Sequence, residues 1–306
     1  MPLFVFNPEH DLCLANGNMH YVPPESARIF AHVGKEVMRI VYGDDAVVVA
    51  ADEYSAWREH GGADDTVVPW GWNTCLKQML LRQGASEEHL LSDDRIEKIR
   101  QLQNRTTIAP LQPHARTATS VEETKSWISY FGSAVLKAPW SGSGWGVRRV
   151  CGTLSDQDIS WLKKILNTQH AVVVEKEYER KDDFAFEFKA TSGNVEMAGL
   201  SLFSTQNGRY RYNWLLYDDE IRVRLEKQKE LMCVENTLLQ WLRTNVAPLY
   251  DGWIGVDLFR TIEDEFVVAE MNVRHTMGWV SHCFLGRHPE CHGKQWSPKR
   301  GLMINS

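Results

Sequence analysis

The sequence predicts an α/β fold whose C-terminal part is α+β. Three patterns along the 306 residues lead to this prediction. Short apolar runs alternate with helical segments near the start, helix-capping signatures flank a glycine-rich hairpin in the middle, and long alternating runs of polar and apolar residues follow. We expect an N-terminal α/β domain over residues 1–92, a central lid subdomain with the glycine loop over 93–178, and a C-terminal subdomain with a large antiparallel sheet over 179–306.

Strand-like runs and helices alternate in the N-terminal domain. The runs LFVFN, VMRIVYG and AVVVA, with DTVVPWGW near residue 66, are rich in the β-branched and aromatic residues typical of strands. A helix is expected from Leu76 to Gln83, and the alternation favours a small, partly parallel sheet. The opening MPLFVFNPEH has neither a basic segment nor a long apolar one. We therefore expect it to form a core strand and not a signal peptide.

Helix starts are clear in the central segment. Residues 93–105, DDRIEKIRQLQNR, place apolar side chains on one face of a charged amphipathic helix. Ser120 with Glu123, and Ser155 with Asp158, have the spacing of capping boxes that begin two further helices. Between these helices, a strand that ends at Lys137 runs into the glycine loop and a return strand. Residues 120–178 therefore predict a compact unit of helix, hairpin, helix and strand.

The C-terminal segment is predicted to form a sheet with one long helix. Residues 183–191, 195–203 and 209–216 alternate polar and apolar side chains, as antiparallel strands with one polar face do. A helix is predicted from about Glu226 to Thr244. Residues 251–278 then predict a strand, a turn at 263–265 and a second strand.

The glycine loop carries the first functional signal. Residues 135–147 read VLKAPWSGSGWGV, so Lys137 precedes glycines at alternating positions. Such glycines let backbone N–H groups approach an anion closely, and the lysine adds a compact positive charge. This pattern favours a phosphate-covering loop, although ordinary hairpin turns also contain glycine and serine. The candidate phosphate-binding residues are Lys137, Ser141, Gly142, Ser143, Gly144 and Gly146.

Polar side chains gather on one face of the hairpin predicted for residues 251–278. Because alternate residues of a strand share a face, Glu270, Asn272 and Arg274 project together while the residues between them point to the core. Asp257 lies on the preceding strand of the same hairpin. Two carboxylates and an amide oxygen suit Mg²⁺, which fills its other positions with water and phosphate oxygens. On its own, the pattern also describes the solvent-facing side of an amphipathic hairpin.

The composition argues against several classes of function. The net charge is −6 and the basic residues are scattered, so no nucleic-acid partner is expected. No apolar run approaches the roughly 20 residues that cross a bilayer, so no membrane partner is expected. The six cysteines form no CxxC pair and predict reduced thiols in a cytoplasmic protein. The tail HCFLGRHPECH lacks the usual spacing of zinc ligands, and no pattern indicates an oligomeric state.

Taken together, the glycine loop and the acidic hairpin resemble the ATP-grasp superfamily, in particular its ATP-dependent carboxylate-amine ligases. The similarity covers roughly residues 90–280 and lies in the order of the parts. These are Lys137 with the glycine loop, the apolar strand and acidic linker VVVEKEY at 172–178, GVD at 255–257, and an E-x-N-x-R strand at 270–274. The resemblance implies an ATP-grasp fold in which the lid and the C-terminal sheet enclose ATP.

The resemblance also implies roles for individual residues. Lys137 contacts the α- and β-phosphates, together with a basic residue from an earlier helix, either Arg95 or Arg105, of which Arg95 is slightly preferred. Arg274 holds the γ-phosphate or a substrate carboxylate and is catalytic together with Lys137. The hinge residues expected to contact nucleotide are Glu175, Lys176, Glu177 and Tyr178, with Asp183 near the ribose. The implied Mg²⁺ ligands are Asp257, Glu270 and Asn272.

The reaction implied by the resemblance is ATP- and Mg²⁺-dependent ligation. A small-molecule or peptide carboxylate attacks the γ-phosphate to give an acyl phosphate, which an amine or similar nucleophile captures. Positioning and charge neutralisation carry the first step, and the sequence shows no motif for covalent catalysis. Two alternatives are a small-molecule kinase of similar fold and a nucleotide-binding protein without turnover. The loops at 7–26 and 69–73 are acceptor-side candidates, because each follows a predicted strand.

Overall fold

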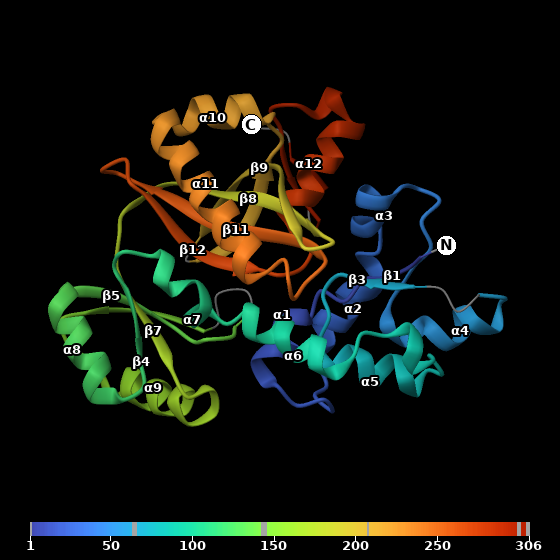
Figure 1. Cartoon of the computed structure of the whole chain (residues 1–306), viewed down its shortest axis with the longest axis horizontal. Coiled ribbons are helices and arrows are strands. Elements are labelled where there is room, and N and C mark those ends of the chain that lie inside the picture. Colours follow the sequence, from blue (N-terminus) through green and yellow to red (C-terminus); the bar gives the residue numbers. More distant parts are fainter. Residues whose placement is uncertain (1, 63–65, 142–145, 207, 299–300, 304–306) are drawn as a thin grey trace.

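The computed structural model describes residues 2–62, 66–141, 146–206, 208–298 and 301–303. The strands of these residues form three sheets that follow one another along the chain. In Figure 1 the N-terminal sheet (blue) lies at the right, the lid sheet (green) at the lower left, and the C-terminal sheet with its helices at the top. The predicted combination of α/β layers with a large antiparallel C-terminal sheet is confirmed. No helix in the described part of the chain is long and apolar enough to cross a membrane.

The N-terminal sheet is parallel and has the order β2-β1-β3. Its strands are β1 (Leu3–Val5), β2 (Val48–Val49) and β3 (Val67–Pro69), and the helices of this part are α1 (His10–Asn16), α2 (Glu25–Val33), α3 (Glu36–Tyr42), α4 (Tyr54–Glu59) and α5 (Thr74–Arg82). Because the strands are parallel, the loops after β1 and β3 meet at one edge of the sheet. There the Asn7 side chain donates to the Gly71 carbonyl at 2.9 Å.

The strand predicted from VMRIVYG is wrong, because these residues form most of helix α3. Val37 and Met38 are buried, and Tyr42 stacks on Phe4 of β1 with ring centroids 3.9 Å apart. Packing of one helical face on the sheet therefore overrides the strand preference of the valines and isoleucine. Gly43 ends the helix with a φ of 112°, a backbone conformation that favours glycine.

Two helices connect the N-terminal sheet to the lid. They are α6 (Asp93–Leu102) and α7 (Arg105–Ile108). The apolar face predicted for the first of them is buried, and Ile99, Leu102 and Ile108 pack into the core of the C-terminal sheet. The side chain of Asn104 caps α7 by accepting from the Thr106 N–H at 2.9 Å. This cap begins a new helix at Arg105 and thereby sets the direction of that side chain.

The lid has the predicted order of helix, hairpin, helix and strand. Its antiparallel sheet has the order β4-β7-β5-β6 and is covered by two helices. The elements are β4 (Ala115–Ala118), α8 (Val121–Phe131), β5 (Ser133–Lys137), β6 (Val147–Cys151), α9 (Asp156–Gln169) and β7 (Val172–Lys176). The side chains of Ser120 and Ser155 cap the two helices as predicted, and Asp158 completes a capping box with Ser155. The buried face is small, with Leu136, Leu162 and Val174 among its residues.

The C-terminal sheet is antiparallel and has the order β12-β11-β8-β9-β10-β13-β14. Its strands are β8 (Arg180–Thr191), β9 (Asn194–Gln206), β10 (Arg209–Trp214), β11 (Gly252–Thr261), β12 (Phe266–Asn272), β13 (Gln295–Ser297) and β14 (Gly301–Met303), and the helices are α10 (Asp218–Leu225), α11 (Gln228–Asn245) and α12 (Met277–Arg287). On β8, Phe184, Phe186 and Phe188 are buried in the core with residues of α10 and α11. Residues that alternate with them along β8, such as Asp183 and Glu187, therefore face the opposite side, and this polar side carries the candidate site.

Candidate active site

The acidic part of the site is built by the hairpin of β11 and β12. Asp257 on β11 lies directly opposite Glu270 on β12. The next pair joins Leu258 to Val268, so Ala269 is the extra residue of a β-bulge. The bulge brings the two carboxylates opposite each other and leaves the Ala269 carbonyl free to accept from outside the hairpin.

The two carboxylates have opposite electrostatic surroundings. Burial, and next the Glu270 charge, raise the pKa of Asp257 well above its usual range. Burial acts on Glu270 in the same direction, but Arg105 and Lys137 outweigh it and lower the pKa of Glu270. A cation bound next to Asp257 would therefore favour its ionised form, which burial and the Glu270 charge disfavour and the Arg274 charge supports only in part.

Lys137 joins the end of lid strand β5 to this hairpin. Its side chain is 5% exposed, and its Nζ lies 2.6 Å from Glu175 Oε2 on β7. The same Nζ donates to the Ala269 carbonyl at the bulge, at 3.1 Å. Burial lowers the pKa of Lys137, which Glu175 partly offsets. The predicted phosphate lysine therefore lies at the junction of the lid and the acidic hairpin.

Arg105, and not Arg95, is the second cation of this cluster. Its Nε donates to Glu270 Oε2 at 2.9 Å, and its Nη1 donates to the Ala138 carbonyl at 2.9 Å and to Ser141 Oγ at 2.6 Å. Arg95 lies in the first turn of α6, where its Nη2 is 3.7 Å from Asp251. The slight preference for Arg95 is therefore not supported by the geometry, because the chain turns at the Asn104 cap and directs Arg105 toward the hairpin.

The base of the glycine loop is held in a defined conformation. The Ala138 N–H donates to the Gly146 carbonyl at 2.8 Å and closes the loop. A Cβ on Gly146 would lie 2.3 Å from the Ser141 Cβ, so only glycine fits there. Ser141 accepts from Arg105, as described above. The predicted residues Gly142, Ser143 and Gly144 lie outside the described residues.

Asn272 connects the acidic pair to Arg274. Its Nδ2 donates to Asp257 Oδ2 at 3.2 Å, and its Oδ1 accepts from Arg274 Nη2 at 3.0 Å. Arg274 also forms a two-pronged ion pair with Asp11 on α1, from Nε to Oδ1 at 3.0 Å and from Nη2 to Oδ2 at 2.8 Å. Arg274 was expected to hold a phosphate or a substrate carboxylate. In the structure, a carboxylate of the chain itself occupies that position.

Asp11 is the member of this charged cluster that the sequence reasoning missed. The segment before it is fixed by buried polar contacts, since His10 Nε2 lies 2.8 Å from Gln103 Nε2 and Gln103 donates to the Val273 carbonyl at 3.1 Å. Burial lowers the pKa of His10 to about 4, so the imidazole is neutral at pH 7. The only signal in the sequence was the polar loop at 7–26, which was identified as an acceptor-side candidate without a role for any single residue.

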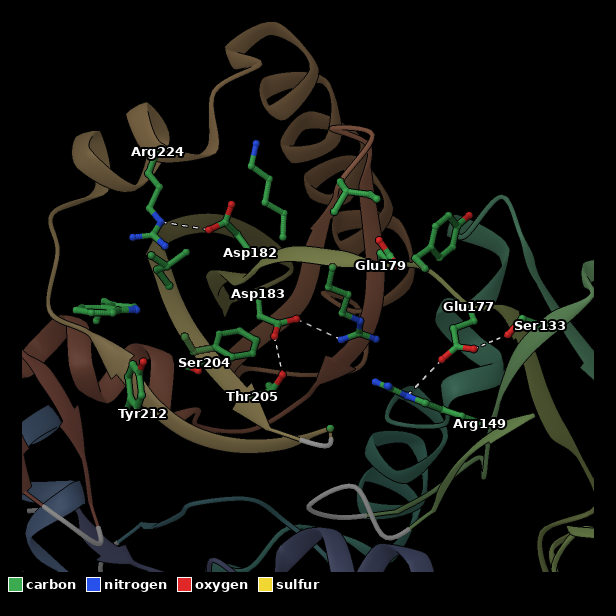
Figure 2. A pocket seen from close by; sticks show the side chains of 18 residues that line it. Ser133, Arg149, Glu177, Glu179, Asp182, Asp183, Ser204, Thr205, Tyr212 and Arg224 are labelled. Atoms are coloured by element: carbon green, nitrogen blue, oxygen red, sulfur yellow. Dashed lines mark hydrogen bonds and ion pairs between the residues drawn. The ribbon is translucent and has the colours of Figure 1, made fainter. Parts of the chain in front are cut away.

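A cavity of about 900 Å³ lies between the lid and the first residues of β8 (Figure 2). Its lining includes the predicted residues Glu177, Tyr178 and Asp183. Figure 2 shows Asp183 with its dashed contact to Thr205, whose hydroxyl donates to Asp183 Oδ2 at 2.7 Å. Arg180 Nη1 donates to Asp183 Oδ1 at 3.2 Å. This volume is in the range of small-molecule sites.

The hinge residues divide between the two ends of the site. Glu175 is 7% exposed and belongs to the cluster through Lys137. Lys176 is exposed, with its Nζ 5.0 Å from the centre of the Tyr178 ring. Glu177 accepts from Ser133 and lies 3.6 Å from Arg149, both in the lid (Figure 2). Residues 175–178 thus connect the charged cluster, at Glu175, with the cavity, at Glu177 and Tyr178.

The donor set of the acidic hairpin consists of oxygen atoms from two acids and one amide. In the described residues, no group of three or more His, Cys, Asp and Glu side chains is arranged to hold a metal ion. Asp257 and Glu270 are only a pair of acids, and Asn272 is their neighbour. Mg²⁺ needs no more than one or two protein carboxylates when phosphate oxygens and water complete its shell, so the set fits Mg²⁺ bound together with a nucleotide.

Comparisons with known proteins identify the fold. No protein-family model matches the sequence, and no curated protein is similar to it. The structure is similar to a biotin carboxylase from Campylobacter jejuni, with a TM-score of 0.57 and 15% identity over 91% of this chain and 67% of that chain. An N5-carboxyaminoimidazole synthetase from Staphylococcus aureus, complexed with ADP, has a TM-score of 0.54 and 13% identity over 90% of this chain and 70% of that chain.

A third similar structure matches over nearly its whole length. The D-alanyl-alanine synthetase A from Vibrio cholerae has a TM-score of 0.54 and 15% identity over 94% of this chain and 93% of that chain. These identities are low, so the likeness concerns the fold. All three proteins are ATP-grasp enzymes, and the present chain has the ATP-grasp fold that its motifs predicted.

Proposed function

We propose that the protein is an ATP- and Mg²⁺-dependent ligase, which activates a small-molecule or peptide carboxylate as an acyl phosphate for attack by an amine or similar nucleophile. One observation carries the proposal. Two buried cations, Lys137 and Arg105, lie at the base of a glycine loop and act on Glu270, which stands opposite Asp257 in the hairpin. Alternating positive and negative groups of this kind match a triphosphate with its metal ion.

The nucleotide is proposed to lie along the hinge. The cavity at Glu177, Tyr178 and Asp183 takes the adenosine, and the phosphates extend toward Lys137 and the glycine loop. Lys137 and Arg105 then exchange Glu175 and Glu270 for phosphate oxygens, which are acceptors of the same charge. The similar structures support a nucleotide at such a site, because the N5-carboxyaminoimidazole synthetase was solved with ADP.

Asp257, Glu270 and Asn272 are the residues proposed to hold Mg²⁺. When bound, Mg²⁺ supplies charge neutralisation at the phosphate oxygens. The chain contributes the opposed carboxylates, and burial and the Glu270 charge raise the pKa of Asp257, which the Arg274 charge offsets only in part. In the structure the Asn272 oxygen accepts from Arg274, so Asn272 would ligate through its second lone pair or after rotation of the amide. Glu270 would likewise release Arg105.

Ligation fits the remaining chemistry of the site. The transfer of a phosphoryl group to a carboxylate needs positioned charges and little proton transfer. His10 and His275 are both buried, and burial lowers the pKa of each to about 4, so neither is suited to take up a proton near pH 7. The similar structures named above are synthetases and a carboxylase, which supports an acceptor carboxylate or a related anion.

Binding and turnover test the proposal in two steps. ATP with Mg²⁺ should raise the melting temperature, because a ligand of the folded state stabilises by about 2.7 kcal/mol at a hundredfold excess over its Kd. ADP and phosphate should then appear only when a carboxylate and an amine are both supplied, since a closed site shields an acyl phosphate from water. Absence of any shift with ATP and Mg²⁺ would exclude the proposal. A phosphorylated alcohol as the stable product would instead establish a kinase.

A further inference from the structure

The ion pair between Asp11 and Arg274 joins the N-terminal part to the acidic hairpin. The two side chains are 263 residues apart in sequence, and both prongs have normal hydrogen-bond lengths of 3.0 and 2.8 Å. They are mostly buried, with 25% of the Asp11 side chain and 15% of the Arg274 side chain exposed. Each charge is therefore largely removed from water and depends on the other for compensation.

Contacts of Arg274 place this pair beside the proposed reaction site. Its Nη2 also donates to Asn272, and its Nη1 donates to the His275 carbonyl at 2.8 Å. Among the described residues, these contacts and the two prongs to Asp11 leave a single Nη1 hydrogen without a partner. A carboxylate held by the Nε edge of Arg274 would thus adjoin Asn272, one of the proposed Mg²⁺ ligands.

The space next to the pair is nearly filled. A cavity lined by Asp11, Gln103, Arg105, Glu270 and Asn272 has a volume of only about 20 Å³, which is room for about one water molecule. Its apolar wall includes Leu14 and Trp140. Because the Nε and Nη2 groups of Arg274 are already bonded to Asp11 and Asn272, a ligand carboxylate that pairs with this edge of the guanidinium must displace the Asp11 carboxylate.

Displacement has a different cost for different ligands. A simple anion that takes the place of Asp11 on Arg274 leaves a buried carboxylate without its counter-charge. A simple cation that binds Asp11 leaves the Arg274 guanidinium buried without a counter-charge. A ligand that carries both a carboxylate and an ammonium group can pair with both residues, so no charge is left uncompensated.

On these grounds we propose that Asp11 and Arg274 are the recognition pair for a zwitterionic acceptor. The ligand is an amino acid or a similar small amino-carboxylate, with its carboxylate on Arg274 and its ammonium group on Asp11. The inference rests on the proposed function, because it places this ligand beside the nucleotide. It adds the class of the acceptor, and it assigns a specificity-determining role to Asp11 in the N-terminal part.

Ligand binding to the wild-type protein gives the first test. The protein is loaded with Mg²⁺ and the β,γ-imido analogue of ATP, and the standard amino acids, D-alanine and β-alanine are each tested by thermal shift. The best binder is then compared by calorimetry with its deaminated acid and its decarboxylated amine. We expect the two singly charged analogues to bind at least about 30-fold more weakly, as is typical when one buried partner is left alone.

The variant Asp11→Asn gives a second and more specific test. Asparagine keeps the shape of the side chain but removes the carboxylate that an anion would leave unpaired. The deaminated acid should therefore bind the variant at least about 10-fold more tightly than it binds the wild type, and the preference for the zwitterion should shrink. A merely structural ion pair predicts no such gain for the anion.

A matched control is available on the surface. Asp44 forms an exposed pair with Arg287 at 3.6 Å, and its side chain is 98% exposed. Asp44→Asn removes a carboxylate from an Asp-Arg pair without touching the site, and it should leave all three affinities unchanged. Far-UV circular dichroism of both variants checks that they fold. If Asp11→Asn does not fold, the test is the wild-type comparison alone, in which the zwitterion should bind at least about 30-fold more tightly than either singly charged analogue.

The outcomes separate the two proposals. If the ATP analogue binds but no zwitterion does, or if the singly charged analogues bind as well as the zwitterion, the inference about Asp11 and Arg274 is overturned and the ATP site stands. If the analogue and Mg²⁺ do not bind at all, the proposed function itself is overturned. An unchanged affinity for the anion in a folded Asp11→Asn variant also overturns the role of Asp11.

Discussion

The two ends of the candidate site differ in how their charged side chains are accommodated. At one end the charged side chains are buried and paired with each other, as Lys137 is with Glu175 and Arg105 with Glu270. At the other end, around Asp183, a cavity of about 900 Å³ is lined by partly exposed side chains. We refer to these regions as the charged end and the cavity end.

This difference indicates what each end requires of its ligand. Buried charges are costly unless paired, so every cation at the charged end has a partner in the absence of ligand, and a ligand must replace that partner. The cavity end has open volume and side chains that water can reach, so a ligand enters without displacing protein. Substitutions at the charged end should therefore affect stability and turnover, whereas those at the cavity end should affect affinity alone.

The largest effect is expected from Lys137→Met. Methionine keeps most of the apolar stem but leaves Glu175 buried without a counter-charge, which typically costs about 3–5 kcal/mol of folding stability. Urea denaturation of the variant measures this loss. A stability within about 1 kcal/mol of the wild type would contradict the view that the charged end is held by compensation.

A double variant separates stability from function at the same position. Adding Glu175→Gln to Lys137→Met removes the unpaired carboxylate, so most of the lost stability should return. ATP binding should not return, because the proposed phosphate cation is still missing. Recovery of both properties in the double variant would mean that Lys137 has no part in ATP binding.

Glu270→Gln should lower turnover while the fold survives. Glutamine retains an acceptor for Arg105 but loses the charge proposed to hold Mg²⁺. Loss of one preorganised electrostatic group raises a barrier by about 3–4 kcal/mol, a factor of hundreds. Phosphate release measures the effect, and Glu263→Gln, in the turn of the same hairpin, is the exposed control. Turnover near the wild-type level in Glu270→Gln would exclude the metal assignment.

Parts of this site follow from the sequence because they depend on local spacing. The helix starts at Ser120 and Ser155 were predicted correctly, since each is decided within four residues. The full capping box forms only at Ser155, because the Glu123 side chain accepts from the Thr119 N–H and not from that of Ser120. The side chains of Asn272 and Arg274 are hydrogen-bonded, as their predicted closeness requires. The strand itself ends at Asn272, however, and Arg274 lies in the bend that follows, so strand alternation alone does not explain the contact.

Other parts depend on contacts that no local pattern contains. The bulge at Ala269 places Glu270 opposite Asp257, although simple alternation says nothing about the register of the two strands. Asp11 meets Arg274 only because the N-terminal part docks on the hairpin. The strand predicted at residues 37–43 failed for the same reason, because burial of one helical face outweighs local preference.

The buried Glu187 on the polar side of β8 allows a test of whether a buried acid without an ion-pair partner among the described residues makes folding stability depend on pH. It accepts from Thr276 at 2.7 Å and from Ser201 at 3.1 Å, and burial raises its pKa from 4.5 to about 7 against these bonds and the charges of His282 and Arg274. The folded state keeps this proton up to about pH 7, whereas the unfolded chain loses it near pH 4.5. The stability that comes from keeping Glu187 protonated in the fold is therefore fully present below about pH 4.5, and it is lost as the pH rises from there through about pH 7.

Glu187→Gln should remove this pH dependence. Relative to the wild type, the variant should gain roughly 3 kcal/mol of stability between pH 4.5 and 8, because only the wild type must ionise a buried acid. Comparing the two proteins at each pH by urea denaturation cancels the contributions of the histidines and of the other acids. A stability difference that does not change with pH would contradict the raised pKa.

The smallest effect is expected at the cavity end, from Asp183→Asn. The Asp183 carboxylate accepts from Arg180 and Thr205 and is the proposed ribose partner. Asparagine keeps one acceptor oxygen, so the loss should be near the value of a single hydrogen bond, about 1 kcal/mol, or roughly a five- to tenfold rise in KM for ATP. The kcat should be unchanged, because a contact made equally in the bound state and the transition state does not alter the chemical step. Steady-state kinetics at saturating acceptor separate the two constants, and Asp264→Asn, in the turn between β11 and β12, serves as the control outside the cavity lining. A fall in kcat for Asp183→Asn as large as that for Glu270→Gln would show that the two ends act as one unit and would remove the distinction drawn between them.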